Sequence, residues 1–227
     1  MKRDTYQKLL SWKISARRKP LILRGARQVG KTYILQKFGN IEYDNVFYCN
    51  FEEDPSFEDF FSNKLEPYSL IKSLSLYFNR EINAEKDLII FDEIQYSNNA
   101  LNALKYFNEK ANQFHIVAAG SLIGLMLSGP RSFPVGKVNI LDMYPMSFLE
   151  FLEAAGKPNL IKLIESTEEF IPYPLPFHNE LIQYLKKYFF VGGMPEAVQD
   201  FVQNDNMKNV RDIQKEILNS YHLSFGF

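Results

Sequence analysis

The chain has 227 residues, of which 46% are hydrophobic and 23% charged, so it is neither a disordered chain nor a coiled coil. A formal net charge of −1 argues against binding of nucleic acid by overall charge, although it leaves room for a local basic patch. The one cysteine cannot form an internal disulfide, and three histidines without cysteine neighbours offer no metal-site spacing.

Strand and helix patterns alternate through the first 144 residues. Apolar runs such as DLIIFD at 87–92 are typical of strands buried on both faces of a parallel sheet. We expect a helix over 4–17 ended by Pro20, strands over 21–23, 43–51, 87–92, 115–120 and 135–141, and helices over 33–38, 70–78 and 100–111. This alternation predicts an α/β fold, a parallel sheet sandwiched by helices.

Only helix patterns follow residue 144. Ser147 and Glu150 have the spacing of a capping box that opens a helix. Apolar spacing predicts further helices over 181–189 and 210–221, the first of them broken by Gly192 and Gly193. We therefore expect a sheet domain over residues 1–144, including the N-terminal helix, and a small all-helical domain over residues 145–227.

Residues 25–32, GARQVGKT, match the phosphate-binding pattern G-x-x-x-x-G-K-[ST] (Walker A) between an expected strand and an expected helix. Backbone N–H groups there line a concavity at a helix N-terminus, where the helix dipole favours an anion. Gly30 lets the backbone approach phosphate oxygens, Lys31 reaches the β- and γ-phosphates from the surface, and the Thr32 hydroxyl can ligate Mg²⁺. The alternative is a glycine turn with a capping threonine.

The pattern predicts an ATP and magnesium site. Its nucleotide contacts are expected from Gly25, Ala26, Arg27, Gln28, Val29, Gly30, Lys31, Thr32 and Tyr33.

Two acids follow a buried strand at its carboxyl end, where open α/β sheets bind ligands. Asp92 would hold the magnesium ion through its water shell, and Glu93 would orient or deprotonate the attacking water. Ser121, at the end of the next strand, could contact the γ-phosphate or cap the helix that follows. A stabilising arginine is expected at Arg131, for which a solvated loop charge is the alternative. Further candidates for that arginine are Arg27, Arg80 and Arg211.

The motifs GARQVGKT, LIIFDEIQ, AAGSLIG, YPMSFLEFL and FVGGMPEAV, in that order, resemble the bacterial and archaeal AAA-type ATP-binding proteins of the AAA_14 family. The resemblance covers about residues 15 to 222. It implies a P-loop core of the additional-strand, catalytic-glutamate class, followed by a helical lid. Relatives usually carry a further C-terminal domain of unknown function (DUF4143), and the end of the family's last helix is incomplete here. We therefore expect a truncated chain.

Two positions in the lid and one in the core bear on that resemblance. Gly193 and Pro195 match the Gly-x-Pro signature of signal-transduction ATPases with numerous domains, which implies a proline against the adenine. The alternative is a helix stop followed by a proline in the first turn of the next helix. Relatives commonly have Gly-Arg where this chain has Gly136-Lys137, so no arginine role is expected there.

These features predict a magnesium-dependent ATPase that drives a conformational switch and is slow in isolation, since no stabilising arginine is assured. The alternative is a nucleotide-dependent binding switch with little or no hydrolysis, acting through a missing C-terminal domain. A small-molecule kinase would need a basic lid, which GGMP lacks, and one core cannot supply both halves of a helicase. The expected macromolecular partner is a protein or DNA, and a homo-oligomer is compatible with the sequence.

The remaining signals are expected to be structural. Cys49 and the three histidines are interpreted as structural residues, and the basic stretch 13–19 as a solvated helix end rather than an anion contact. Aromatic residues make up 15% of the chain, and some rings are expected to pack on a segment outside it. No stretch approaches 18 apolar residues and no signal-peptide core is present, so a cytoplasmic protein without a membrane partner is predicted.

Overall fold

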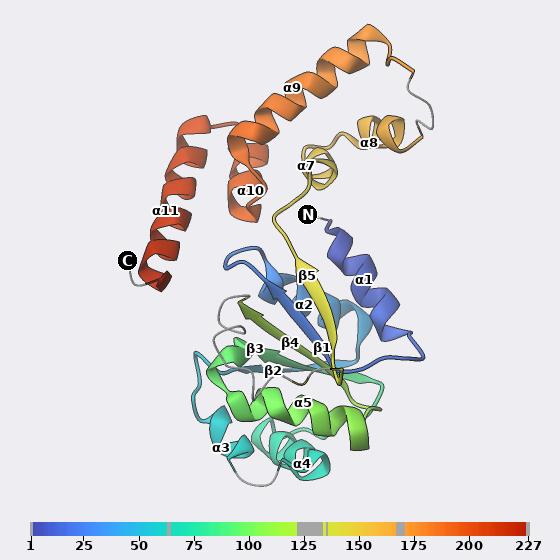
Figure 1. The fold of residues 1–227 in the computed structure, drawn as a ribbon, viewed down its shortest axis with the longest axis vertical. Coiled ribbons are helices and arrows are strands. Elements are labelled where there is room, and N and C mark those ends of the chain that lie inside the picture. Colours follow the sequence, from blue (N-terminus) through green and yellow to red (C-terminus); the bar gives the residue numbers. More distant parts are fainter. Residues whose placement is uncertain (1, 63–64, 122–133, 135, 167–170, 226–227) are drawn as a thin grey trace. The chain divides into compact units, whose positions relative to one another are not determined.

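The computed structural model describes residues 2–62, 65–121, 134, 136–166 and 171–225 (Figure 1). Its backbone contacts divide the chain into two compact units. The first, here the sheet unit, comprises Thr5–Ala26 and Gly30–Met143. The second, here the helical unit, comprises Met1–Asp4, Arg27–Val29 and Tyr144–Phe227.

Five parallel strands form the sheet, in the order β2-β3-β4-β1-β5. They are β1 (Leu21–Gly25), β2 (Asn45–Asn50), β3 (Asp87–Asp92), β4 (His115–Ser121) and β5 (Asn139–Met143). The additional strand that the family resemblance implied is β4, which separates β1 from β3. The predicted α/β fold with a parallel sheet is confirmed.

One strand starts later than its apolar run predicts. β5 begins at Asn139 rather than at 135, because Gly136 adopts a left-handed conformation with a φ of 74°. The N–H of Lys137 donates to the carbonyl of Pro134 at 3.0 Å, which closes a turn where the strand was expected.

The sheet unit's helices lie before β1 and between successive strands. They are α1 (Asp4–Lys13), α2 (Lys31–Glu42), α3 (Phe57–Phe61), α4 (Pro67–Tyr77), the 3₁₀ turn η1 (Ile94–Tyr96) and α5 (Asn98–Lys110). α1 begins at the last residue of Met1–Asp4 and runs on into the sheet unit. The five-residue helix α3 was not predicted, since its sequence FEDFF is too short for a helical period to show.

Helices cover both faces of the sheet (Figure 1). Ile89 and Phe91 of β3 belong to the core cluster that also contains buried residues of α3, α4 and α5. Their neighbours Leu88 and Ile90, which point to the opposite face, are also 0% exposed. Cys49 of β2 is buried in the same cluster as Phe91, as its sequence position predicted, and burial raises the pKa of its thiol.

Six phenylalanine rings form one cluster inside the sheet unit. Rings meet edge to face at centroid distances of 5.4 to 6.1 Å, an arrangement that suits their quadrupoles. The members are Phe47, Phe51, Phe57, Phe61, Phe78 and Phe91. Phe78 is partly buried and the other five rings are buried within the sheet unit. The expectation that some rings pack on a segment outside the chain stays a prediction for the exposed aromatic residues.

The basic stretch after α1 corrects the expectation of a solvated helix end. α1 ends at Lys13, four residues early, and the Lys13 ammonium donates to the carbonyl of Glu42. The Arg18 guanidinium donates to the carbonyls of Asn112 and Phe114 at 2.5 and 3.3 Å. Lys19 donates to the carbonyl of Gly136 at 2.6 Å. These contacts anchor the turn between α1 and β1 to the sheet unit, and the helix ends before the basic stretch.

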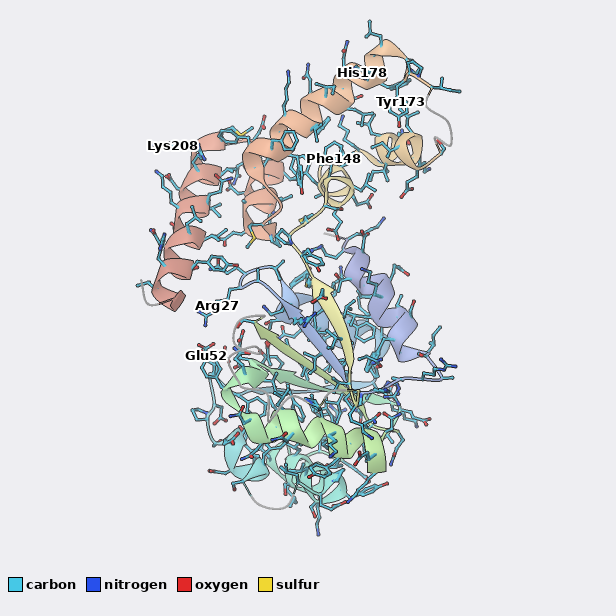
Figure 2. All side chains as sticks on the ribbon, viewed as in Figure 1. Arg27, Glu52, Phe148, Tyr173, His178 and Lys208 are labelled. Atoms are coloured by element: carbon cyan, nitrogen blue, oxygen red, sulfur yellow. The ribbon has the colours of Figure 1, made fainter. Side chains whose placement is uncertain are left out.

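The helical unit is built from α7 (Phe148–Ala154), α8 (Pro158–Glu165), α9 (Leu175–Val191), α10 (Pro195–Asn204) and α11 (Met207–Phe225). The predicted capping box is confirmed, because Ser147 Oγ accepts from the N–H of Glu150 at 3.2 Å and Glu150 Oε2 accepts from the N–H of Ser147 at 2.9 Å. Arg3 Nε donates to Glu150 Oε1 at 3.0 Å, which pairs this buried carboxylate. Phe148, labelled in Figure 2, packs against Tyr188 with ring centroids 5.7 Å apart.

Two properties of the described residues follow from this architecture. No strand occurs after Met143 among them, as predicted. No helix within the described ranges is both long and apolar enough to cross a membrane.

His115 is buried at the start of β4, which makes the stability of the sheet unit depend on pH. Its Nδ1 lies 2.7 Å from the Tyr43 hydroxyl, and Trp12 meets it edge-on. Burial, with Arg18 and Lys13 nearby, lowers the pKa of His115 to about 4. The unfolded chain takes up this proton near pH ~6.5 but the folded chain does not, so stability should fall as the pH drops from about 6.5 towards 4.

We expect this residue to contribute a slope of at most about 1.4 kcal/mol per pH unit in that window. Urea unfolding of wild type and His115→Gln at pH 7 and pH 5 measures this contribution. Protonation of carboxylates lowers the free energy of unfolding of both proteins alike, so the difference between them isolates the histidine. Wild type should lose more stability than the variant, and parallel losses would contradict the interpretation.

Candidate functional site

The predicted phosphate-binding loop joins the end of β1 at Gly25 to the start of α2 at Lys31. Gln28 and Gly30 have φ values of 60° and 94°, both in the left-handed region. Gly30 adopts this conformation without strain, whereas Gln28 is a non-glycine residue held there by the loop. Left-handed residues beside helical ones turn successive N–H groups towards one side, as in anion-binding turns, and α2 adds its N-terminal dipole.

Lys31 corrects one expectation of the sequence analysis, because only 5% of the residue is exposed. Its ammonium donates to the carbonyls of Gly25 at 3.2 Å and Ala26 at 2.9 Å. The loop curls around the side chain, so the aliphatic stem is covered and the charge is paired with carbonyl dipoles. The lysine is therefore an internal brace of its own loop as well as the predicted phosphate contact.

The sheet brings two predicted residues from distant parts of the sequence together. Thr32 Oγ1 donates to Asp92 Oδ2 at 2.6 Å. Asp92 is 1% exposed, and its Oδ1 accepts from the N–H of Glu93 at 3.0 Å. A buried carboxylate is costly unless hydrogen bonds satisfy it, and these donors meet that requirement.

Two further residues at this acid were missed by the sequence analysis. Tyr48 OH on β2 donates to Asp92 Oδ2 at 2.8 Å, and Asn50 Nδ2 donates to the Tyr48 hydroxyl oxygen at 3.3 Å. Burial, followed by the contact with Asp92, raises the pKa of Tyr48 and keeps the phenol protonated. The available signal was the pair of polar residues two apart on one strand, which share a face of the sheet.

Glu93 comes directly after Asp92 but has a different environment. Its φ of 49° is left-handed, which is uncommon for a residue with a Cβ, and it turns the chain into η1. Its carboxylate accepts from Gln95 Nε2. At the other end of η1, Tyr96 OH donates to Glu52 Oε1 at 3.1 Å, and Glu52 is labelled in Figure 2.

The other predicted site residues have varied positions. Ser121 pairs with Gly25 in the β1–β4 register, so it ends its strand beside the start of the loop. Tyr33 is 60% exposed on α2. Arg131 and the residues after Ser121 up to 133 lie outside the described part of the chain.

Gly193 and Pro195 are explained by local packing within the helical unit. The carbonyl of Gly193 accepts from the N–H of Met146 at 2.6 Å, and a Cβ on Gly193 would collide with the Met146 main chain. Pro195 occupies the first position of α10, where its missing N–H has no intrahelical partner to lose. The helix stop and restart therefore account for these residues, and the adenine contact stays a prediction.

The donor set at Asp92 and Thr32 fits a magnesium ion. A carboxylate and a hydroxyl are hard oxygen ligands, and Mg²⁺ is typically held by one or two carboxylates, substrate phosphates and water. Within the described ranges no group of three or more His, Cys, Asp or Glu side chains could hold a metal ion. The residues present therefore suit a metal that arrives with a phosphate ligand rather than a structural metal.

Comparison with known proteins agrees with this geometry. Residues 17–152 match the family AAA_14, described as an AAA domain. An uncharacterized protein of Methanocaldococcus jannaschii, MJ1637, is 26% identical over 192 residues, which are 79% of this chain and 39% of that protein. The chain thus spans about two fifths of this relative's length.

Among solved structures, the chain is similar to the Walker-type ATPase PABY2304 of Pyrococcus abyssi. The TM-score is 0.53 at 14% identity, over 98% of this chain and 73% of that one. At this level of identity the likeness concerns the fold, which is that of a P-loop ATPase.

The buried position of Lys31 leads to a prediction about stability. Lys31→Met keeps the apolar stem but leaves the carbonyls of Gly25 and Ala26 without their donor. We expect the free energy of unfolding to fall by about 1–3 kcal/mol, measured by urea denaturation. The control is Lys37→Met on the same helix, where a half-buried lysine should change stability by less than about 0.5 kcal/mol. Equal stabilities for the two variants would show that Lys31 does not brace the loop.

Proposed function

The chain belongs to the AAA domain family AAA_14, and from this premise we propose that it binds ATP with Mg²⁺ and hydrolyses it to drive a conformational change. The observation that carries the proposal is the 2.6 Å hydrogen bond between Thr32 and Asp92. It joins the phosphate-binding loop to the acid at the end of a separate strand, which is the pairing that P-loop NTPases use around their metal.

The loop supplies the phosphate contacts in this proposal. The N–H groups from Gln28 to Thr32 and the Lys31 ammonium would bind the triphosphate, with Gly25, Ala26, Arg27 and Val29 completing the loop and Tyr33 following it. Lys31 would exchange its bonds to two carbonyls for bonds to phosphate oxygens. The loop carbonyls thus hold the lysine charge inside the loop before the ligand binds.

Thr32 and Asp92 would hold the magnesium ion, Thr32 through its hydroxyl oxygen and Asp92 through the ion's water shell. The ion, when bound, would neutralise charge that develops on the phosphate oxygens. Thr32 can keep its proton on Asp92 while its oxygen lone pairs remain available, since a hydroxyl is both a donor and an acceptor.

Glu93 is the residue we assign to the attacking water. A general base must accept a proton. Among the described residues, the Glu93 carboxylate accepts from the Gln95 amide, whereas the buried Asp92 carboxylate accepts from Thr32, Tyr48 and the N–H of Glu93. Ser121, which ends β4 beside Gly25, would contact the γ-phosphate or this water.

The later steps of the cycle rest on the family and on sequence. Arg131 is proposed as the arginine that stabilises the transition state, and Gly193 with Pro195 as the adenine contact of a helical lid over residues 145–227. The switch would act on a protein or DNA partner, and self-association of the chain is part of the same proposal. Turnover should be slow for the isolated chain if that arginine is not in place.

Phosphate release and nucleotide binding test the proposal together. Glu93→Gln should bind ATP with little change in affinity but reduce turnover by about 10²–10⁴-fold, because it removes the base and keeps the shape of the side chain. Lys31→Met should weaken ATP binding by at least about tenfold, since it removes a charge-assisted contact with phosphate. Isothermal titration gives the affinity and a phosphate-release assay gives the rate.

Two matched variants serve as controls. Glu53→Gln changes an exposed glutamate of the same unit, and Lys37→Met changes a lysine of the same helix as Lys31. Both should behave as wild type. Tight ATP binding without turnover in wild type would instead favour the binding switch, and ATP affinity unchanged in Lys31→Met would refute the nucleotide site.

A further inference from the structure

The acid at the end of β3 accepts more hydrogen bonds than the loop alone provides. Asp92 Oδ2 accepts from two hydroxyls, Thr32 Oγ1 at 2.6 Å and Tyr48 OH at 2.8 Å. Its Oδ1 accepts from the N–H of Glu93 at 3.0 Å. A carboxylate has about four acceptor sites, two on each oxygen, so these donors from the described residues fill both sites of Oδ2 and one of the two on Oδ1.

The direction of the Tyr48 hydrogen bond follows from its neighbours. Asn50 Oδ1 accepts from the N–H groups of Glu52 at 3.0 Å and Glu53 at 3.3 Å, which assigns the amide oxygen to that side. The amide nitrogen must then face Tyr48, where it donates to the phenol oxygen at 3.3 Å. The phenol proton is therefore directed to Asp92, and a chain of donors runs from the loop after β2 to the carboxylate.

The two hydroxyls differ in what holds them. Thr32 stands in the first turn of α2, directly after the phosphate-binding loop, and is itself assigned to the metal. Tyr48 stands on β2, whose register with β3 places Asn50 opposite Asp92 and Tyr48 opposite Ile90. Tyr48 is thus the hydroxyl donor to Asp92 that is not itself assigned to the metal or the phosphates.

We propose that Tyr48 is a positioning residue for metal-dependent nucleotide binding, in which its hydroxyl fixes the rotation of the Asp92 carboxylate and reserves the remaining acceptor site of Oδ1 for a magnesium-bound water. The proposal rests on the magnesium role of Asp92 in the proposed function. Groups that orient a metal-binding residue from behind typically change metal affinity by about 10–100-fold when they are removed.

The test measures ATP affinity in EDTA and across a Mg²⁺ titration, with Tyr48→Phe, which removes the hydroxyl and keeps the ring. We expect the Mg²⁺ concentration at half-effect to rise about 10–100-fold while affinity in EDTA stays that of wild type. Thermal melting confirms that the variant is folded. An unchanged Mg²⁺ midpoint would overturn the proposal, and so would equal losses of affinity with and without Mg²⁺, which indicate a general structural defect.

Tyr43→Phe is the matched control. Tyr43 is also a half-buried phenol, but its hydroxyl contacts His115 Nδ1 at 2.7 Å and it precedes β2, away from the carboxyl ends of the strands. Its Mg²⁺ midpoint should equal that of wild type even where its stability falls. A shift like that of Tyr48→Phe would overturn the specific role of Tyr48.

A double-mutant cycle with Asp92→Ala separates this proposal from the proposed function. If Tyr48 acts through Asp92, Tyr48→Phe should cause no further shift in the Asp92→Ala background. An additional shift there would overturn the positioning role while leaving the magnesium site intact. If wild type itself gains no affinity from Mg²⁺, the magnesium role in the proposed function fails, and this inference fails with it.

Discussion

The hydrogen bond between Thr32 and Asp92 depends on the strand order and the direction of the strands in the sheet. The two residues are 60 positions apart, and β4 separates the strands that lead to them. Because β1, β4 and β3 run in parallel, their carboxyl ends lie at the same end of the sheet, where the segment after β1 can reach the acid at the end of β3. The buried Asp92 carboxylate would destabilise that edge without donors, and Thr32, Tyr48 and the N–H of Glu93 provide them.

Many polar contacts in this part of the molecule are made between the residues of the site themselves. The Lys31 ammonium is bound by loop carbonyls and the Asp92 carboxylate by hydroxyls. A ligand that enters such a site exchanges hydrogen bonds instead of adding them, so its affinity comes from charge and from bonds that are shorter or better aligned than those it replaces. The left-handed conformations of Gln28 and Glu93 are also held by contacts within this part of the molecule, since backbone strain of this kind persists only where surrounding contacts hold it.

Local patterns predicted the elements whose signal is continuous in sequence, and non-local contacts decided the rest. The run DLIIFD predicted both ends of β3 correctly, because a strand buried on both faces is apolar along its whole length. β5 and α1 were misjudged at their ends because Gly136 and Arg18 make contacts that no periodicity records. α8 begins at a proline and spans only 8 residues, so its apolar positions are too few to show a period. Lys31 and Tyr48 were misread or missed for a related reason: how a loop folds over a side chain, and which strand lies beside another, are properties of the tertiary structure.

The neighbouring acids Asp92 and Glu93 show how one dipeptide can supply two different groups. Asp92 ends a strand, points where β2 and the loop can both donate to it, and is nearly inaccessible to solvent at 1% exposure. Glu93 is the first residue outside the sheet, and its left-handed backbone turns its side chain into the environment of η1, where Gln95 is its donor. Asp92 is a fixed acceptor whose Oδ2 takes both hydroxyl donors, whereas Glu93 is a partly exposed carboxylate that accepts from the Gln95 amide. The change of backbone conformation between residues 92 and 93 therefore gives two adjacent carboxylates separate surroundings, and the proposed function assigns one to the metal and the other to the attacking water.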